Sequence, residues 1–198
     1  MLAVMFKATK SGTEQYDGYM SIQVPVNMRK FYPSDTLRNF SMYCAIRIPL
    51  NKDYEFSELL TEIDEQLKVK ADKQSMSEML TSTENLINSI KLIPLIIKNP
   101  VSKIMYGVLG DKAFSNTLSN LGVVNMPACC LEHIESMDFV LGTSVINRVS
   151  SAMITINNTT TFSITKKTLD PSYEETMYKI LVNEGITVDV EGSDIYEN

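Results

Sequence analysis

The sequence contains a single histidine, His133, among its 198 residues. A metal site built from several histidines is therefore excluded, and a histidine-based catalytic device has only one candidate. Glu132, Glu135 and Asp138 are its nearest carboxylates along the chain. Their spacing does not fix any of them as the partner that would orient the ring of a general base. The alternative is a half-exposed histidine without a catalytic role.

Cysteine, positive charge and long apolar runs are also scarce. Three cysteines, two of them the adjacent Cys129 and Cys130, cannot form a disulfide framework, so we expect a reducing, cytoplasmic location. The net charge of −6, from 18 Lys and Arg against 24 Asp and Glu, argues against a nucleic-acid-binding domain. The apolar run from Leu92 to Ile97 is far shorter than the roughly 20 residues of a membrane span.

Motifs for several common chemistries are missing from the sequence. It has no glycine-rich phosphate loop, no zinc-ligand spacing and no nucleophile elbow. Cys129 and Cys130 could supply a nucleophile, but adjacent residues on a strand point to opposite faces, so at most one could serve a site. The 12 methionines could line an apolar channel or simply fill the core. We expect no metal and no bound cofactor.

Regular alternation of apolar and polar residues predicts the strands. Every even position from Met20 to Met28 is apolar, which predicts a strand with one buried face and with Asn27 and Arg29 on the other. Asn157–Asn158 separates two further alternating runs and tolerates the positive φ of a tight hairpin turn. The complete set of expected strands is 20–29, 41–50, 114–124, 134–141, 149–156, 160–167 and 186–190.

Helical spacing of apolar residues predicts the remaining elements. Ser57 is the expected cap of one helix and Asp170–Pro171 of another, whereas the helix at residues 1–10 has no cap, as if it continued something longer. Two other helices are expected at 76–90 and 100–110. The predicted fold class is α+β, a mixed β-sheet with helices packed on it, in one unit over residues 1–198.

Five segments of the chain carry a family resemblance. VPVNMRKFYPSDTLRNF, at Val24 to Phe40, is similar to a signature of bacterial alcohol-acetyltransferase-like proteins, which belong to the chloramphenicol acetyltransferase and condensation-domain superfamily. The other four follow in the family's order and extend the resemblance over nearly the whole chain. They are IPLIIKN at 93–99, TLSNLG at 117–122, MDFVLG at 137–142 and NEGITV at 183–188.

The resemblance implies an incomplete enzyme. Members of this superfamily are pseudo-dimers of two lobes with the active site in a tunnel between them. Their catalytic base is the second histidine of an HHxxxD motif in the N-terminal lobe. This sequence has no such motif, since His133 begins HIESMD and no histidine precedes it. The chain therefore resembles the C-terminal lobe alone, with acyl-CoA as the co-substrate of the complete enzyme.

The resemblance also implies roles for individual residues. Arg29 matches an arginine that pairs with the aspartate of HHxxxD and anchors the histidine loop; the alternative is a salt bridge within the lobe, for instance to Asp35. Ser119 matches a serine whose hydroxyl stabilises the oxyanion of the tetrahedral intermediate, with Asn120 as a neighbouring amide donor. One such fixed donor contributes roughly 3 kcal/mol. The alternative is that these residues only shape the end of a strand.

Four further positions complete the expected site. Asn27 and Gly122 are assigned to substrate binding beside Arg29 and Ser119. MDFVLG resembles the DFGWG motif of plant acyltransferases, which lies far from the reacting atoms, so Asp138 and Gly142 are assigned structural roles.

Two functions remain open at this point. One is the C-terminal lobe of an acyl-CoA-dependent O-acyltransferase, which pairs with an N-terminal lobe and supplies tunnel wall and oxyanion donors. The other is a non-catalytic interaction lobe that binds a protein partner, or a second copy of itself, through an exposed apolar face. We expect that face near Arg29, Ser119 and the loop from Lys30 to Phe40.

Overall fold

The structure is a computed structural model that describes residues 1–11, 18–91, 94, 96, 99, 114–143 and 149–192. It confirms an α+β fold with a mixed sheet and packed helices. In chain order the elements are α1 (Leu2–Ser11), β1 (Tyr19–Asn27), the short 3₁₀ helix η1 (Met28–Lys30), β2 (Ser41–Pro49), α2 (Phe56–Lys70), α3 (Lys73–Ile90), β3 (Asn116–Val123), α5 (Ala128–Leu131), β4 (Val149–Ile156), β5 (Thr159–Lys166) and α6 (Ser172–Asn183).

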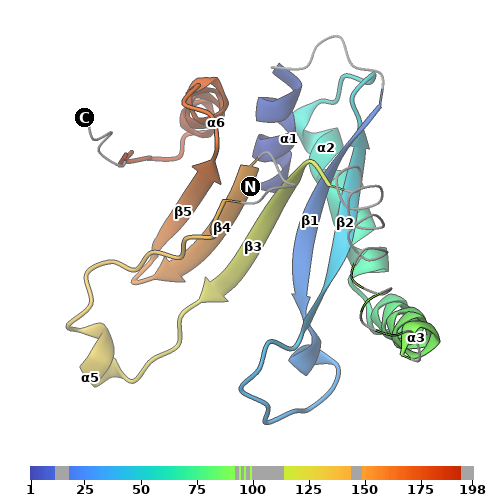
Figure 1. The fold of residues 1–198 in the computed structure, drawn as a ribbon. Coiled ribbons are helices and arrows are strands. Elements are labelled where there is room, and N and C mark those ends of the chain that lie inside the picture. Colours follow the sequence, from blue (N-terminus) through green and yellow to red (C-terminus); the bar gives the residue numbers. More distant parts are fainter. Residues whose placement is uncertain are drawn as a thin grey trace.

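The five strands form one sheet in the order β2-β1-β3-β4-β5 (Figure 1). The two outer pairs, β1–β2 and β4–β5, are antiparallel, whereas β1–β3 and β3–β4 are parallel. β1 pairs with β2 along its whole length, but its ladder with β3 joins only Ile22 to Asn116 and Gln23 to Thr117. The parallel strands β1 and β3 therefore separate toward their carboxyl ends, as Figure 1 shows.

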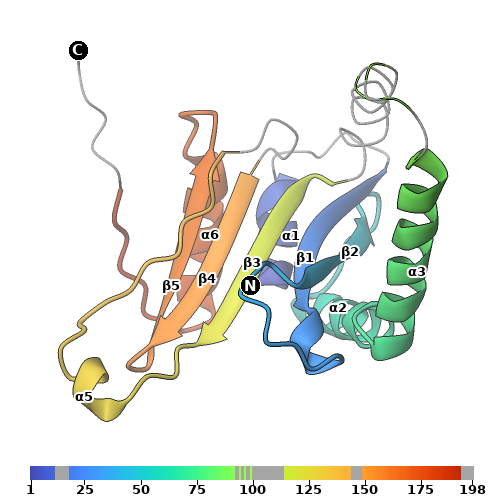
Figure 2. The same ribbon diagram turned by 60° about the horizontal axis from the view of Figure 1, so that its bottom comes forward.

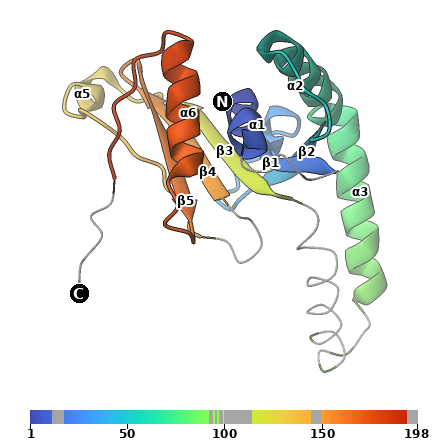
Figure 3. The same ribbon diagram turned by 90° about the horizontal axis from the view of Figure 1, so that it is seen from above.

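One face of the sheet carries the helices. The alternation predicted for the first two strands is confirmed, because Met20 and Ile22 of β1 and Ile46 and Ile48 of β2 are buried. Figure 3 shows α6, α1 and α2 on the same side of the sheet. α1 is buried almost all round, which fits a helix held between two others and the sheet.

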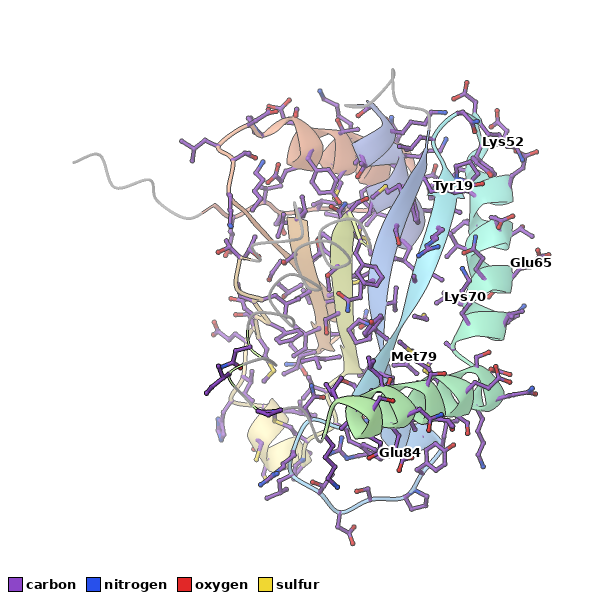
Figure 4. All side chains as sticks on the ribbon, turned by 45° about the vertical axis from the view of Figure 1, so that its right-hand side comes forward. Tyr19, Lys52, Glu65, Lys70, Met79 and Glu84 are labelled. Carbon is purple, nitrogen blue, oxygen red and sulfur yellow. The ribbon has the colours of Figure 1, made fainter. Side chains whose placement is uncertain are left out.

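The outer edge of β2 is covered by side chains of α2. Gln66 donates to the carbonyl of Arg47 at 2.8 Å and accepts from its N–H at 3.0 Å. Lys70, which lies between α2 and β2 in Figure 4, donates to the carbonyl of Ala45 at 2.9 Å. Burial and the neighbouring positive charge of Arg47 lower the pKa of the Lys70 ammonium. These contacts satisfy backbone groups that an uncovered edge strand would offer to another chain.

The hairpin prediction is confirmed in detail. Asn157 and Asn158 have φ of 47° and 66°, and the strands on either side pair from Ile156–Thr159 to Val149–Lys166 without a bulge. A two-residue turn with positive φ at both positions matches the twist of the strands that it joins.

Two predicted strands are wrong. Residues 134–141 belong to the long connection from β3 to β4, which crosses β4 and β5 on the face opposite the helices. Asn157 and Thr165 hold that connection through hydrogen bonds of 2.8 Å to the carbonyls of Ile134 and Leu141. Ile186–Val190 is also outside the sheet. Neither segment has a ladder partner among the described residues, so each remains irregular despite its apolar pattern.

Two smaller expectations also need correction. Ser57 lies inside α2, whose cap is Glu55 in a capping box with Glu58. Cys129 and Cys130 lie on α5 and not on a strand, and both are exposed free thiols. The helix predicted at 100–110 lies outside the described residues. Among the residues that are described, no helix has the length and apolar character needed to cross a membrane.

Candidate functional site

The residues predicted for catalysis and substrate binding lie at the carboxyl ends of β1 and β3. In open sheets with parallel strands, ligands bind beyond the carboxyl ends of neighbouring strands. Thr117 is level with Gln23, and their side chains hydrogen-bond at 3.1 Å on the face away from the helices. Ser119 follows Thr117 by two residues, so its side chain is on the same face, just beyond the point where β1 and β3 separate.

Ser119 presents its hydroxyl on the face of the sheet opposite the helices. Its neighbour Leu118 is buried against the helices, and the alternation of the strand therefore turns Ser119 the other way. Ser119 pairs with Ala152 on β4, whose side chain is only a methyl group. No described residue hydrogen-bonds to the Ser119 hydroxyl. Ser119 is half-buried on a regular strand, which fixes the position of its hydroxyl.

The segment Ser119 to Gly122 ends the regular part of β3 in a bulge. The register with β4 shifts between Asn120 and Val123, and the ladder resumes where the Val124 N–H donates to the Thr155 carbonyl at 2.8 Å. Asn120 Oδ1 accepts from the Gly122 N–H at 2.8 Å, so the side-chain oxygen stabilises the turn and its exposed NH₂ group faces away from that bond. Bulges redirect side chains and are common next to binding sites.

Gly122 has φ +75°, a conformation that residues with a Cβ adopt only at a cost. We predict that Gly122→Ala lowers the free energy of unfolding by about 1–2 kcal/mol, because a Cβ there meets open space and only backbone strain is added. Urea unfolding of both proteins measures the difference. Gly142→Ala is the matched control, since Gly142 also faces open space but has no positive φ; its effect should stay within about 0.5 kcal/mol. Equal effects of the two substitutions would contradict the prediction.

Arg29 lies beyond the end of β1, not within it. The strand ends at Asn27, whose Oδ1 accepts from the Arg29 N–H at 3.0 Å and so caps the 3₁₀ helix η1. The Arg29 guanidinium donates through Nη2 to the carbonyls of Thr36 and Arg38, at 2.5 and 2.9 Å. Its carbon lies 5.9 Å from the centre of the Phe40 ring. Arg29 therefore holds the loop between β1 and β2 in a closed shape.

The Arg29 guanidinium is exposed and has no carboxylate partner among the described residues. In particular, it forms no salt bridge with Asp35, the partner that the sequence suggested as an alternative. Its Nε and Nη1 make no hydrogen bond to a described residue. An arginine offers a planar fork of donors that fits a carboxylate. The end of the fork that does not hold the loop is therefore open to an acid from another lobe or chain.

The other candidate residues lie on the connection from β3 to β4. Asp138 and Gly142 are exposed there, and the backbone between them is tied to β5 through the Leu141 carbonyl. His133 follows α5 and is exposed, with its Nε2 3.9 Å from Glu132 Oε1. That contact is too long to be the hydrogen bond that orients a catalytic imidazole.

Two cavities lie away from these residues. One, of about 510 Å³, is between α1 and the loop that follows β2, and the Lys10–Asp53 ion pair is part of its wall. The other, of about 450 Å³, lies between the edge of β2 and the start of α3, where the Tyr43 and Phe114 rings meet edge to face with centroids 5.3 Å apart. Within the described ranges, no group of three or more His, Cys, Asp or Glu side chains is placed to hold a metal ion.

The sequence did not reveal the Phe40 ring beside Arg29. It also did not reveal the hydrogen bond between Gln23 and Thr117, which joins β1 to β3 before the strands separate. The polar odd positions of β1 were the available signal for Gln23. The Phe40 contact depends on how the loop folds back, which no local pattern reveals.

Comparison with known proteins adds no family assignment: no protein-family model matches the chain, and no curated protein matches it.

Proposed function

We propose that this chain is the C-terminal lobe of an acyl-CoA-dependent O-acyltransferase of the chloramphenicol acetyltransferase and condensation-domain superfamily. It would complete the substrate tunnel and stabilise the oxyanion, while a lobe with the HHxxxD motif supplies the base. The observation that carries the proposal is the bulge at the end of β3. There a strand-held hydroxyl with no partner among the described residues, and an exposed amide group, lie beyond the point where two parallel strands separate.

The proposed division of labour follows from the chemistry of acyl transfer. A histidine takes the proton of the acceptor hydroxyl, and the resulting oxygen nucleophile attacks the thioester carbonyl of acyl-CoA. The carbonyl oxygen then becomes an oxyanion, which needs fixed donors because negative charge develops there in the transition state. Ser119 would donate its hydroxyl and Asn120 its free amide hydrogens. The tetrahedral intermediate collapses with loss of the CoA thiolate, which receives a proton from the histidine.

Asn27 and Arg29 would contribute to the site by positioning other groups. Asn27 caps η1 and thereby sets the direction in which Arg29 leaves β1. Arg29 would use the open side of its guanidinium to hold the aspartate of the HHxxxD loop. Gly122 would keep the wall beside Ser119 open, since it carries no side chain.

Exposed apolar side chains at the same end of the sheet favour the second candidate, a lobe that binds a protein without catalysis. Leu37 lies in the loop after β1, and Leu121 and Val123 lie at the end of β3; all three are exposed. Such side chains suit a protein interface. A second acyltransferase lobe and a non-catalytic partner could both cover them, so activity with an HHxxxD lobe separates the two functions.

We predict that the isolated chain releases no CoA from acetyl-CoA in the presence of short-chain alcohols, because its one histidine lacks an orienting partner in the described structure. Mixing or fusing it with an HHxxxD-bearing lobe from an alcohol-acetyltransferase-like protein should produce turnover, measured as free thiol. Turnover by the isolated chain that His133→Ala abolishes would overturn the lobe assignment. Tight binding of the second lobe without turnover would favour the interaction lobe.

A further inference from the structure

The two edges of the sheet differ in whether their outward backbone groups are covered. The edge of β2 is covered by Gln66 and Lys70 of α2, which bond to its outward backbone groups. β5 forms the opposite edge (Figure 2), and no described residue bonds to its outward backbone groups. Edge strands left in this state pair readily with another strand.

The hairpin geometry identifies which backbone groups of β5 point outward. In a two-residue hairpin, the closing pair Ile156–Thr159 exchanges hydrogen bonds, and bonded and non-bonded pairs then alternate along the ladder. The N–H and C=O groups of Thr161, Ser163 and Thr165 therefore point to β4. Those of the intervening residues point away from the sheet, at positions 160, 162, 164 and 166.

β5 also lacks the usual protection of an edge strand. It reads TTTFSITK, with no proline, no bulge in its ladder and no charge before Lys166. From Thr161 onward its side chains are half-buried, because α6 packs on one face and the connection from β3 to β4 lies on the other. Both faces of β5 are therefore covered, whereas its outward backbone groups have no partner among the described residues.

The sequence of β5 is complementary to itself in one antiparallel register. With Ser163 on a two-fold axis, the outward bonded pairs are Phe162 with Ile164 of the copy and Thr160 with Lys166 of the copy. An aromatic residue then faces a β-branched one, and no like charges are opposed. The remaining facing pairs are Thr161 with Thr165 and Ser163 with Ser163, which are small polar pairs suited to close contact.

From this register we propose that β5 is a homodimerisation edge, at which two copies of the chain join into one continuous ten-stranded sheet through antiparallel β5–β5 pairing. The two-fold axis is perpendicular to the sheet, so the helices of both copies lie on the same side. α6, which covers β5, exposes Tyr178 and Val182, and these add apolar contact area above the joined strands. The inference does not depend on the proposed acyltransferase function.

The test uses the full 198-residue chain and measures its mass in solution over a range of concentrations. The wild-type protein should reach twice its 22.3 kDa monomer mass. Ser163→Lys and Ser163→Asp each oppose like charges across the axis and should each weaken association at least roughly fivefold. An equimolar mixture of the two variants should recover the dimer, because Lys then faces Asp.

The mixture separates loss of pairing from loss of folding, since misfolded variants would not rescue one another. Ser57→Lys, on the exposed surface of α2, is the matched control and should dimerise like the wild type. Three results would overturn the inference: a wild type that stays monomeric up to its solubility limit, a dimer unaffected by Ser163→Lys, or a charge-swapped mixture that stays monomeric. If the full chain is monomeric but a chain truncated after Gly185 dimerises, the β5 edge is occupied by Ile186–Val190 of the same chain and not by a second copy.

Discussion

In a two-lobe enzyme that contains this chain, Ser119→Ala should lower kcat on the order of 10²-fold and leave KM nearly unchanged. The reason is that a hydrogen bond to the carbonyl oxygen strengthens only as negative charge develops on it. Ser119 suits this role because its strand fixes its position and its hydroxyl has no partner among the described residues. Steady-state rates of CoA release at varied acetyl-CoA give both constants.

Thr117→Val is the matched control for the Ser119 variant. It also removes a hydroxyl from the face of β3 opposite the helices, but one that bonds to Gln23 within the sheet and precedes Ser119 by two residues. We expect kcat within about threefold of the wild type, since the Thr117 hydroxyl is bonded within the sheet and its loss changes stability rather than the transition state. Wild-type kcat for Ser119→Ala would remove Ser119 from the mechanism, and an equal loss in both variants would indicate general damage to the strand.

The largest expected effect on stability is at the centre of the helix layer. Met5 on α1 is 0% exposed and belongs to the main core cluster. Met5→Ala should lower the free energy of unfolding by about 2–5 kcal/mol, because the lost side chain leaves a cavity that a helix packed on all sides cannot close. Urea unfolding followed by circular dichroism measures the loss.

Leu37→Ala controls for the removal of an apolar side chain without a cavity. Leu37 is fully exposed in the loop after β1, so its truncation should change stability by no more than about 0.5 kcal/mol. A Met5→Ala protein as stable as the Leu37→Ala protein would show that α1 is not part of the core in solution.

Sequence periodicity predicted most of the elements, because it reports which face of a segment is apolar. It succeeded where that face has a partner layer, as for β1 and β2 under α1 and α2. It failed at 134–141 and at Ile186–Val190, where the apolar pattern is present but no neighbouring strand is available among the described residues. Strand formation depends on hydrogen bonds to a second segment, and one segment's sequence does not contain that information.

The sequence predicted the strands that carry the candidate residues but not how those residues are held. The carboxyl ends of β1 and β3 lie at the same end of the sheet because the two strands are parallel, and one strand's sequence does not specify its neighbour. However, the strand predicted from Met20 extended two residues too far, because Asn27 ends the strand by capping η1. Nη2 of the Arg29 guanidinium donates hydrogen bonds to the carbonyls of Thr36 and Arg38. These contacts depend on how the loop folds back on itself in three dimensions.

The parallel contact between β1 and β3 also affects how the chain reaches its native state. β1–β2 and β4–β5 are antiparallel pairs formed by strands that follow each other in the sequence, whereas Gln23 and Thr117 are 94 residues apart. Closing such a long loop costs more chain entropy than closing a hairpin, so contacts of this range form slowly. The two halves of the sheet can thus assemble separately and join last at β1–β3. The proposed two-lobe site, which needs Arg29 from the first half and Ser119 from the second, would come into existence only in that final step.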